Sequence, residues 1–318
     1  MHVDDFGTTS THGAISGFGL RECVMLGHRA EYERPRLPYQ MESWVIFSTL
    51  DRQGEPLIEY PFGAVAWFSD VHVTRGRSLY VTDLEGKLYM YPLSNCTGRT
   101  WVPAVSFPQG TFLHGVWSVD DDHVYIWAND ATEHFLFAGS GTHWTRMIGP
   151  PFEVTIVRGD APDHLVAGGT HGELARWDGK RWTRLPMEAR TSVTGIAVVD
   201  DSMFWVTTRA GQLFEGNNKR VSERLRTPGA PLRDVAVWRN RVWLAGADDG
   251  LLRLREHGNE LEDVKPNVPV FQFDSRGELL MCCPDLLAAT TDAVTYLGTA
   301  AGMFAKARGA VPPHWESP

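Results

Sequence analysis

The stretch GGTHGELARWDGKRWTRLP, residues 168–186, contains a unit that the chain repeats. Its Gly-x-Leu element at residues 172–174 recurs at 211–213 and at 250–252, each step being 39 residues. An earlier copy lies at 86–88, two periods of 43 residues upstream of the first. A fixed period of this length is the signature of a repeat architecture, so we interpret the stretch as one copy of a structural unit.

Two further registers support the repeat. The block Trp182 to Leu185 has a counterpart 38 residues upstream, Trp144 to Met147. Several segments also share one layout, an apolar run, a short turn rich in Asp, Asn or Gly, and a second apolar run, which is typical of a β-hairpin. These segments are 114–128, 154–169, 193–208, 232–246 and 268–282.

Four short antiparallel strands in every 38–44 residues predict the blade of a β-propeller. Six units begin near residues 64, 111, 153, 191, 231 and 268, and the segment 14–62 holds enough strand for a seventh. We therefore expect an all-β propeller of seven four-stranded blades with little helix, six blades being the alternative. We also expect one blade to combine strands from both ends of the chain.

The block HLVAGGTHGELARWDGKRWTRLP, followed by VTGIAVVDDSMFWVTT, resembles the repeats of bacterial propellers related to the photosystem assembly factor and kelch-like families. The resemblance is best over residues 115–255. The chain departs from WD40 repeats in lacking their Gly-His and Trp-Asp signature, and from kelch repeats in having the Gly168-Gly169 pair only once. The resemblance implies a propeller fold and a tendency to bind proteins, and it carries over no catalytic residue.

We interpret the main residues of the repeated unit as structural. Gly172 and Gly179 are predicted to occupy turns with positive φ. Leu174 and Leu185 are predicted to pack between blades, and Trp182 to cover the outer strand.

The length and composition favour one globular domain. The chain has 318 residues, 43% of them hydrophobic and 22% charged. We expect an N-terminal extension over 1–13, a single propeller over 14–309 and a C-terminal tail over 310–318.

The composition is acidic, with 39 acidic against 30 basic residues and a formal net charge of −9. This argues against a nucleic-acid partner and is compatible with a basic protein partner. Only five of the basic residues are Lys, which indicates a GC-rich bacterial genome.

The sequence shows no signal peptide and no apolar run long enough to span a membrane, so we expect a cytoplasmic monomer with no membrane partner. Cys23, Cys96, Cys282 and Cys283 form no C-x-x-C pair and are interpreted as reduced thiols, the last two as inert packing.

No motif predicts a catalytic residue, a metal site or a cofactor. The sequence lacks a G-x-S-x-G elbow, a P-loop, an H-E-x-x-H pair and a G-x-G-x-x-G motif before a helix. The clusters Asp120–Asp122, Asp200–Asp201 and Asp248–Asp249 recur in turns, and we assign them to turn chemistry rather than to calcium.

Aromatic, Arg and His residues outside the repeat consensus are the candidates for partner binding, because Trp, Tyr and Arg dominate binding hot spots. The competing interpretation is that the tryptophans pack between blades. The predicted partner-binding residues are His114, Trp117, His171, Arg233, Trp238 and Arg239.

Three function classes remain open at this point. The favoured one is a non-enzymatic propeller that recognises a protein partner through one face, with an immunity protein or inhibitor of a basic toxin or effector as its narrower form. The alternatives are a hydrolase or lyase with its active site in the central channel, and a sugar-binding lectin.

Overall fold

The chain folds into antiparallel sheets with almost no helix. The computed structural model describes residues 2–3, 8–19, 22–31, 42–50, 56–95, 100–227, 229–256, 258–283, 287–290 and 296–299. These residues form seven sheets, and their helical content is one 3-10 turn at Leu93–Asn95. The fold is therefore a seven-bladed β-propeller, as the repeat predicted.

The strands divide between two compact units, which are described separately. Unit 1 comprises residues 1–73, 77–109 and 274–318, and unit 2 comprises residues 74–76 and 110–273.

The sheets of unit 1 are each made of consecutive strands. The first has the strands β1 (His2–Val3), β2 (Thr8–Gly19), β3 (Glu22–Glu31), β4 (Glu42–Leu50) and β5 (Pro56–Val65). The second has β6 (Phe68–Val73), β7 (Ser78–Asp83), β8 (Lys87–Pro92) and β9 (Val105–Ser106). The last sheet of the chain has β26 (Gln272–Asp274), of which Asp274 is assigned to unit 1, and then β27 (Leu279–Cys282), β28 (Leu287–Thr290) and β29 (Tyr296–Thr299).

The expectation that one blade combines strands from both ends of the chain is wrong. Among the residues that the structure describes, the strands up to residue 65 pair only with one another, and the strands from residue 272 onward complete a sheet of four. Strand β2 begins at Thr8, inside the segment set apart as an extension, whereas the expected tail at 310–318 lies outside the described residues.

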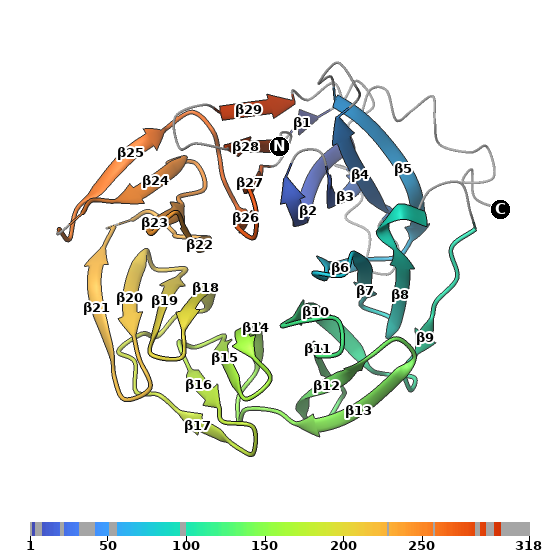
Figure 1. Cartoon of the computed structure of the whole chain (residues 1–318), viewed down its shortest axis with the longest axis horizontal. Helices are drawn as coiled ribbons and strands as arrows, with labels where there is room; N and C mark the ends of the chain where they lie inside the picture. The colour runs from blue at the N-terminus through green and yellow to red at the C-terminus, as the bar shows by residue number, and fades with distance from the viewer. Residues whose placement is uncertain are drawn as a thin grey trace. The chain divides into compact units, whose positions relative to one another are not determined.

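Unit 2 contains four successive sheets, each with its first strand innermost and its fourth outermost (Figure 1). The first two consist of β10 (Phe112–Ser118), β11 (Val124–Asn129), β12 (His134–Ser140), β13 (His143–Ile148), β14 (Val154–Ala161), β15 (His164–Gly169), β16 (Leu174–Trp177) and β17 (Trp182–Arg184). The next two consist of β18 (Val193–Asp200), β19 (Met203–Thr208), β20 (Gln212–Gly216), β21 (Val221–Arg226), β22 (Asp234–Trp238), β23 (Arg241–Ala245), β24 (Leu251–Leu254) and β25 (Leu261–Lys265).

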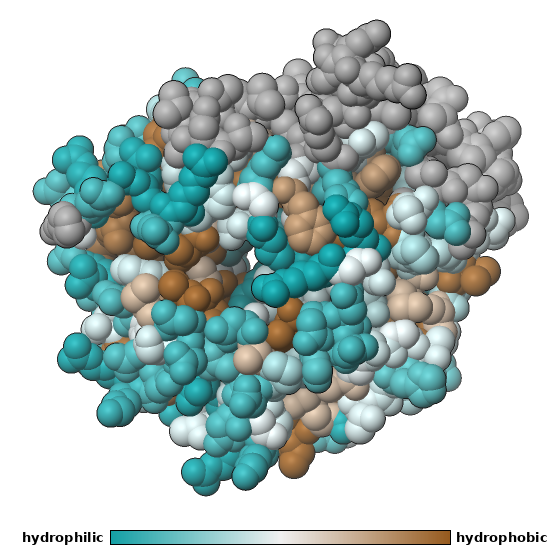
Figure 2. Space-filling model, in the orientation of Figure 1, coloured by the Kyte–Doolittle hydropathy of each residue, from teal (hydrophilic) through white to brown (hydrophobic). Residues whose placement is uncertain are grey.

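The core of unit 2 lies between successive sheets. Side chains alternate across a strand, so each sheet has two faces to bury, one against the sheet before it and one against the sheet after it. Leu174 and Leu185 of one sheet pack with Val193, Phe204 and other apolar residues of the next, as predicted. In Figure 2, hydrophobic side chains gather over the inner strands β18 and β22, and hydrophilic ones follow the outer strands β17 and β21.

The repeat glycines have the predicted conformation. Gly172 has a φ of 83° and Gly179 a φ of 85°, and the copies of Gly172 at residues 86, 211 and 250 share positive values. Trp182 lies on the outermost strand β17, and its Nε1 donates to the carbonyl of Ile148 on the outermost strand of the preceding sheet, at 2.9 Å. The stretch 168–186 is thus a structural unit of one blade.

Candidate functional site: the inner hairpin turns of unit 2

The four innermost strands of unit 2 run in the same direction, which gives the unit two distinct ends. At the start of these strands, Thr155 Oγ1 donates to Val193 O of the next sheet, and Thr194 Oγ1 donates to Leu232 O. Near their far end, Trp117 Nε1 donates to Gly159 O of the next sheet. Equivalent turns of successive sheets therefore lie at the same end.

We call one end the inner-hairpin end and the other the linker end. The inner-hairpin end holds the turns that join the first strand of each sheet to the second, residues 119–123, 162–163, 201–202 and 239–240. The linker end holds the connections between sheets and the turns that join the second strand to the third, among them residues 170–173 and 246–250.

Three of the predicted partner-binding residues lie at the inner-hairpin end. Trp117 is half-buried, and the guanidinium carbon of Arg158 lies 4.5 Å from the centre of its ring. Trp238 is only 5% exposed and packs edge-on against Trp243, while exposed Arg239 covers it with its guanidinium carbon 4.7 Å from the ring centre. Trp238 and Trp243 are both largely covered, so the group that a partner can reach at this corner is Arg239.

The other three lie at the linker end. His114 is exposed in a bulge of β10, and its Nε2 lies within hydrogen-bond distance of Asn129 Oδ1. His171 has a side chain that is 78% exposed, in the turn between β15 and β16. Arg233 is half-buried, its guanidinium carbon lies 5.5 Å from the Phe271 ring centre, and its Nε is buried without a hydrogen-bond acceptor among the described residues. The structure thus divides the six residues between opposite ends, so they do not form one surface.

Carboxylates gather at the inner-hairpin end, over three successive sheets. The turn from β10 to β11 holds Asp120–Asp122. Asp160 lies near the end of β14 and Asp163 in the turn after it, and Asp200 is the last residue of β18 with Asp201 in the turn after it. We call these seven residues the acidic arc.

Part of the acidic arc is used to build the turns, as the sequence predicted. Asp120 Oδ1 accepts hydrogen bonds from the backbone N–H groups of Asp122 and His123, and Asp200 Oδ1 accepts from Ser202 N and Oγ. The bonds from Ser202 hold the pKa of Asp200 below its usual value, so this carboxyl stays ionised. Asp121 accepts hydrogen bonds from Thr74 Oγ1 and Gly76 N.

Three of the other carboxylates have no such role. Asp122, Asp163 and Asp201 are exposed, and none of them forms an ion pair with a residue that the structure describes. Turn chemistry therefore explains only some of the aspartates. The sequence signal for the rest was present, because acidic pairs recurred in the same hairpin turn, but only the strand order shows that those turns share one end.

The Asp248–Asp249 pair does not join the acidic arc. It lies in the turn between β23 and β24, at the linker end, where both side chains are exposed. It therefore offers a matched set of carboxylates at the opposite end of the same unit.

Two members of the acidic arc each pair with a histidine. His164 Nδ1 is 2.5 Å from Asp160 Oδ1, and His164 is buried. Similarly, His123 Nδ1 is 2.8 Å from Asp120 Oδ1, although here both side chains are partly exposed. His164 also interacts electrostatically with Asp200. No group of three or more His, Cys, Asp or Glu side chains in the described part of the chain is arranged to hold a metal ion.

The described cysteines are packed within unit 1. Cys23 and Cys282 belong to one apolar cluster, and Cys283 is also buried, whereas Cys96 lies outside the described residues. Burial raises the pKa of the Cys23 thiol to about 12, so it stays protonated and unreactive near neutral pH. Among the described residues, no helix is long and apolar enough to cross a membrane.

Comparison with known proteins agrees with the propeller class. No protein-family model matches the sequence, and the search of curated proteins gives no match. Among solved structures, the chain is similar to the WD40 β-propeller domain of Doa1, with a TM-score of 0.68 and 10% identity over 87% of this chain and 93% of that one.

Two further structures are similar. YCF48 bound to a D1 peptide has a TM-score of 0.55 and 13% identity, covering 73% of this chain and 80% of that one. Virginiamycin B lyase from Staphylococcus aureus has a TM-score of 0.58 and 10% identity, covering 73% and 84%. At such identities the likeness shows the fold alone, and it does not assign the chain to the kelch-like or assembly-factor families.

Proposed function

We propose that this protein is a non-enzymatic propeller that binds a protein partner with a basic surface through the inner-hairpin end of unit 2. The observation that carries the proposal is the acidic arc, seven carboxylates in or beside the inner hairpin turns of three successive sheets. Exposed carboxylates on one side of a protein steer and orient a partner of opposite charge.

Two further features support a protein partner. The turns are held by internal hydrogen bonds, so the arc is preorganised and binding needs little further ordering. Arg239 lies at the same end, stacked on Trp238, and an arginine fixed on an indole is a frequent hot-spot arrangement. The peptide named in the YCF48 structure is an example of a ligand bound by a protein of similar fold.

The narrower form of the proposal is an inhibitor that masks a basic toxin or effector in a bacterial cytoplasm. It follows from the same charge complementarity, because a propeller of net charge −9 can cover a basic active surface. Co-expression with the captured partner should relieve the growth defect that the partner alone causes. Absence of such relief, with binding intact, would overturn this form and leave the binding proposal standing.

The test of the binding proposal compares the two ends of unit 2. The tagged full-length protein is used to capture partners from its own cell lysate, with quantitative mass spectrometry of the bound proteins. The test variant carries Asp122→Asn, Asp163→Asn and Asp201→Asn, and the matched control carries Asp248→Asn and Asp249→Asn at the linker end.

We expect one basic protein in stoichiometric amount on the wild type and on the control, and a loss of at least about tenfold on the triple variant. Capture that survives the triple variant but is lost on His114→Ala with His171→Ala would place the binding site at the linker end and refute the proposed face. A lysate that yields no bound protein would refute the proposal as a whole.

A further inference from the structure

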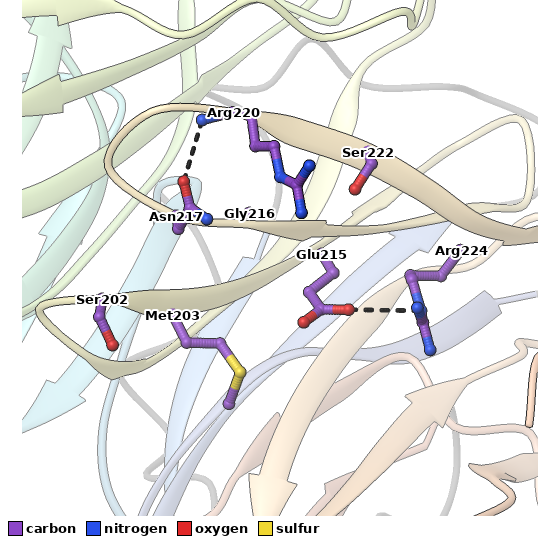
Figure 3. A pocket seen from close by; sticks show the side chains of 8 residues that line it. All are labelled: Ser202, Met203, Glu215, Gly216, Asn217, Arg220, Ser222 and Arg224. Atoms are coloured by element: carbon purple, nitrogen blue, oxygen red, sulfur yellow. Dashed lines mark hydrogen bonds and ion pairs between the residues drawn. The ribbon is translucent and has the colours of Figure 1, made fainter. Parts of the chain in front are cut away.

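A polar cavity of about 350 Å³ lies on the sheet β18–β21 of unit 2. Its walls include Met203 at the start of β19, Glu215 on β20, Arg220 just before β21, and Ser222 and Arg224 on β21. Residues 220, 222 and 224 alternate along the chain, so their side chains share one face of the sheet, and in Figure 3 they converge on the cavity. Its volume is at the lower end of the range for small-molecule sites.

The positive charge in this cavity exceeds the negative charge. Arg224 Nε lies 3.3 Å from Glu215 Oε2, but the geometry makes no hydrogen bond, and this nitrogen is buried without an acceptor among the described residues. Arg220 forms no ion pair with any residue that the structure describes. Glu215 is the one carboxylate in the cavity wall, against two guanidinium groups.

The equivalent turn in the preceding sheet explains why the Arg220 guanidinium has no ion pair among the described residues. There, Asp178 Oδ1 accepts from the backbone N–H groups of Lys180 and Arg181, and its Oδ2 lies 3.8 Å from Arg181 Nε. One repeat later, Asn217 Oδ1 makes the same two bonds, to Lys219 and Arg220, at 2.9 and 3.0 Å. Replacing the carboxylate by an amide keeps the turn and removes the counter-charge.

Several other arginines on or beside the third and fourth strands of the sheets in unit 2 are neutralised. Arg226 pairs with Glu223 at 2.9 Å, Arg253 with Glu262 at 2.8 Å, and Arg255 with Glu260 at 3.2 Å. Arg220 departs from this pattern at the place where the surface is hollowed.

We propose that this cavity binds the oxyanion group of a small ligand, a carboxylate or a phosphate, between Arg220 and Arg224. Guanidinium groups present paired donors that match two oxygens of either anion. The Ser222 hydroxyl and the Asn217 amide supply further donors from the same wall, and Met203 supplies an apolar surface for a short hydrocarbon part. This site goes beyond the proposed partner binding, since it uses the opposite charge.

The acidic arc limits how the charge of the ligand can be distributed. Asp200 and Asp201 precede Ser202, which also lines the cavity, so negative charge lies at that side. An anion is therefore held at the β21 side, and a ligand with several spread charges is disfavoured. Replacing Asp201 by Asn should tighten the binding of the anion.

The test is calorimetric titration of the full-length protein with inorganic phosphate and, separately, with glutarate. We expect one site per chain for at least one of the two probes, and the preferred probe identifies the chemistry of the anion. Arg220→Gln and Asn217→Asp should each weaken that binding by at least about tenfold. Arg181→Gln, at the equivalent position of the preceding sheet, should leave it unchanged.

Asn217→Asp separates the proposal from a folding defect. Because Asp178 closes the equivalent turn, the variant should keep the turn and the melting temperature while supplying Arg220 with a carboxylate. Binding of neither probe to the wild type, or equal binding to wild type and Asn217→Asp, would overturn the proposal. An equal loss on Arg181→Gln would also overturn it, since it would show a response to net charge only.

Discussion

The structure of the blade requires a glycine at position 172. It lies in the turn between β15 and β16 with a φ of 83°, in the left-handed region that side chains with a Cβ rarely adopt. A Cβ built there would lie 2.6 Å from the backbone carbonyl carbon and oxygen of Ala189, which belong to the linker into the next sheet. Both the dihedral angle and the space require glycine.

We expect Gly172→Val to lower the free energy of unfolding by at least about 2 kcal/mol, because a β-branched side chain adds backbone strain to the clash with Ala189. Thermal and denaturant unfolding followed by circular dichroism measures the change. The neighbouring His171→Ala, at an exposed side chain, is the control and should melt like the wild type. A normal melt for Gly172→Val would contradict the assignment of this turn.

Asp83 gives a residue-scale prediction with a defined pH dependence. Burial raises its pKa from 3.8 to about 6, although its Oδ1 accepts hydrogen bonds from the backbone N–H groups of Glu85 and Lys87. The folded protein therefore holds a proton that the unfolded chain releases at lower pH. This favours the folded state at acidic pH, and the advantage is lost as the pH rises through about 6.

Asp83→Asn removes the charge and keeps an oxygen that can accept both backbone bonds. At about pH 8 we expect the variant to be more stable than the wild type by about 1–3 kcal/mol, from 1.36 kcal/mol per pKa unit. Near pH 4.5 the difference should shrink strongly. Urea unfolding at the two pH values measures it, and a gain of equal size at both would show that the carboxyl is not the cause.

The innermost strands are the elements that join one sheet to the next. Thr155, Thr194 and Asp234 occupy equivalent positions near the start of β14, β18 and β22, and each bonds the backbone of the following sheet. In unit 1 the next copy, Asp274 at the end of β26, accepts from Gly17 N at 3.0 Å. A short polar side chain at this position therefore links successive blades.

We expect Thr194→Val to lower the free energy of unfolding by about 1 kcal/mol, because the carbonyl of Leu232 loses its donor while the side chain keeps its shape. Thr183→Val is the matched control on the outermost strand β17, where the threonine is exposed, and should change stability by less than about 0.5 kcal/mol. Chemical unfolding of both variants measures the two changes in the free energy of unfolding. Equal effects would mean that the loss reflects strand propensity rather than the link between sheets.

At the scale of the whole molecule, the net charge of −9 and the acidic arc predict how binding depends on salt. This prediction rests on the proposed function. The association rate constant for the captured basic partner should fall several-fold between about 20 and 200 mM salt, because screening shortens the reach of surface charges.

The triple variant Asp122→Asn, Asp163→Asn, Asp201→Asn should show a weaker salt dependence, whereas the dissociation rate should change less. Surface plasmon resonance at several salt concentrations measures both rates. A salt dependence that is identical for wild type and variant would show that the arc does not steer the partner.

Much of the fold could be predicted because it depends on a local pattern that repeats. Gly172, Leu174 and Leu185 belong to the repeated unit of the blade. A structural interpretation made for one copy therefore applies to the other sheets. The pairing of the terminal strands could not be predicted in this way. It depends on whether strands from the two ends of the chain pair with each other, and the local repeat period carries no information about that.

The repeat in the sequence was enough to predict the strand order within a blade and the turns, with seven blades favoured over six, because alternation of apolar residues and glycine placement act over a few neighbours. Which turns share an end of a unit became visible in the folded protein alone. The tertiary structure separated Trp238 and Arg239 from His114 and His171, buried the indoles, and brought the aspartates of three hairpins together. It also placed Arg220 at a cavity where two guanidinium groups face one carboxylate. The physical reason is that charge and exposure are properties of a surface, which forms only when sheets distant in sequence pack against one another.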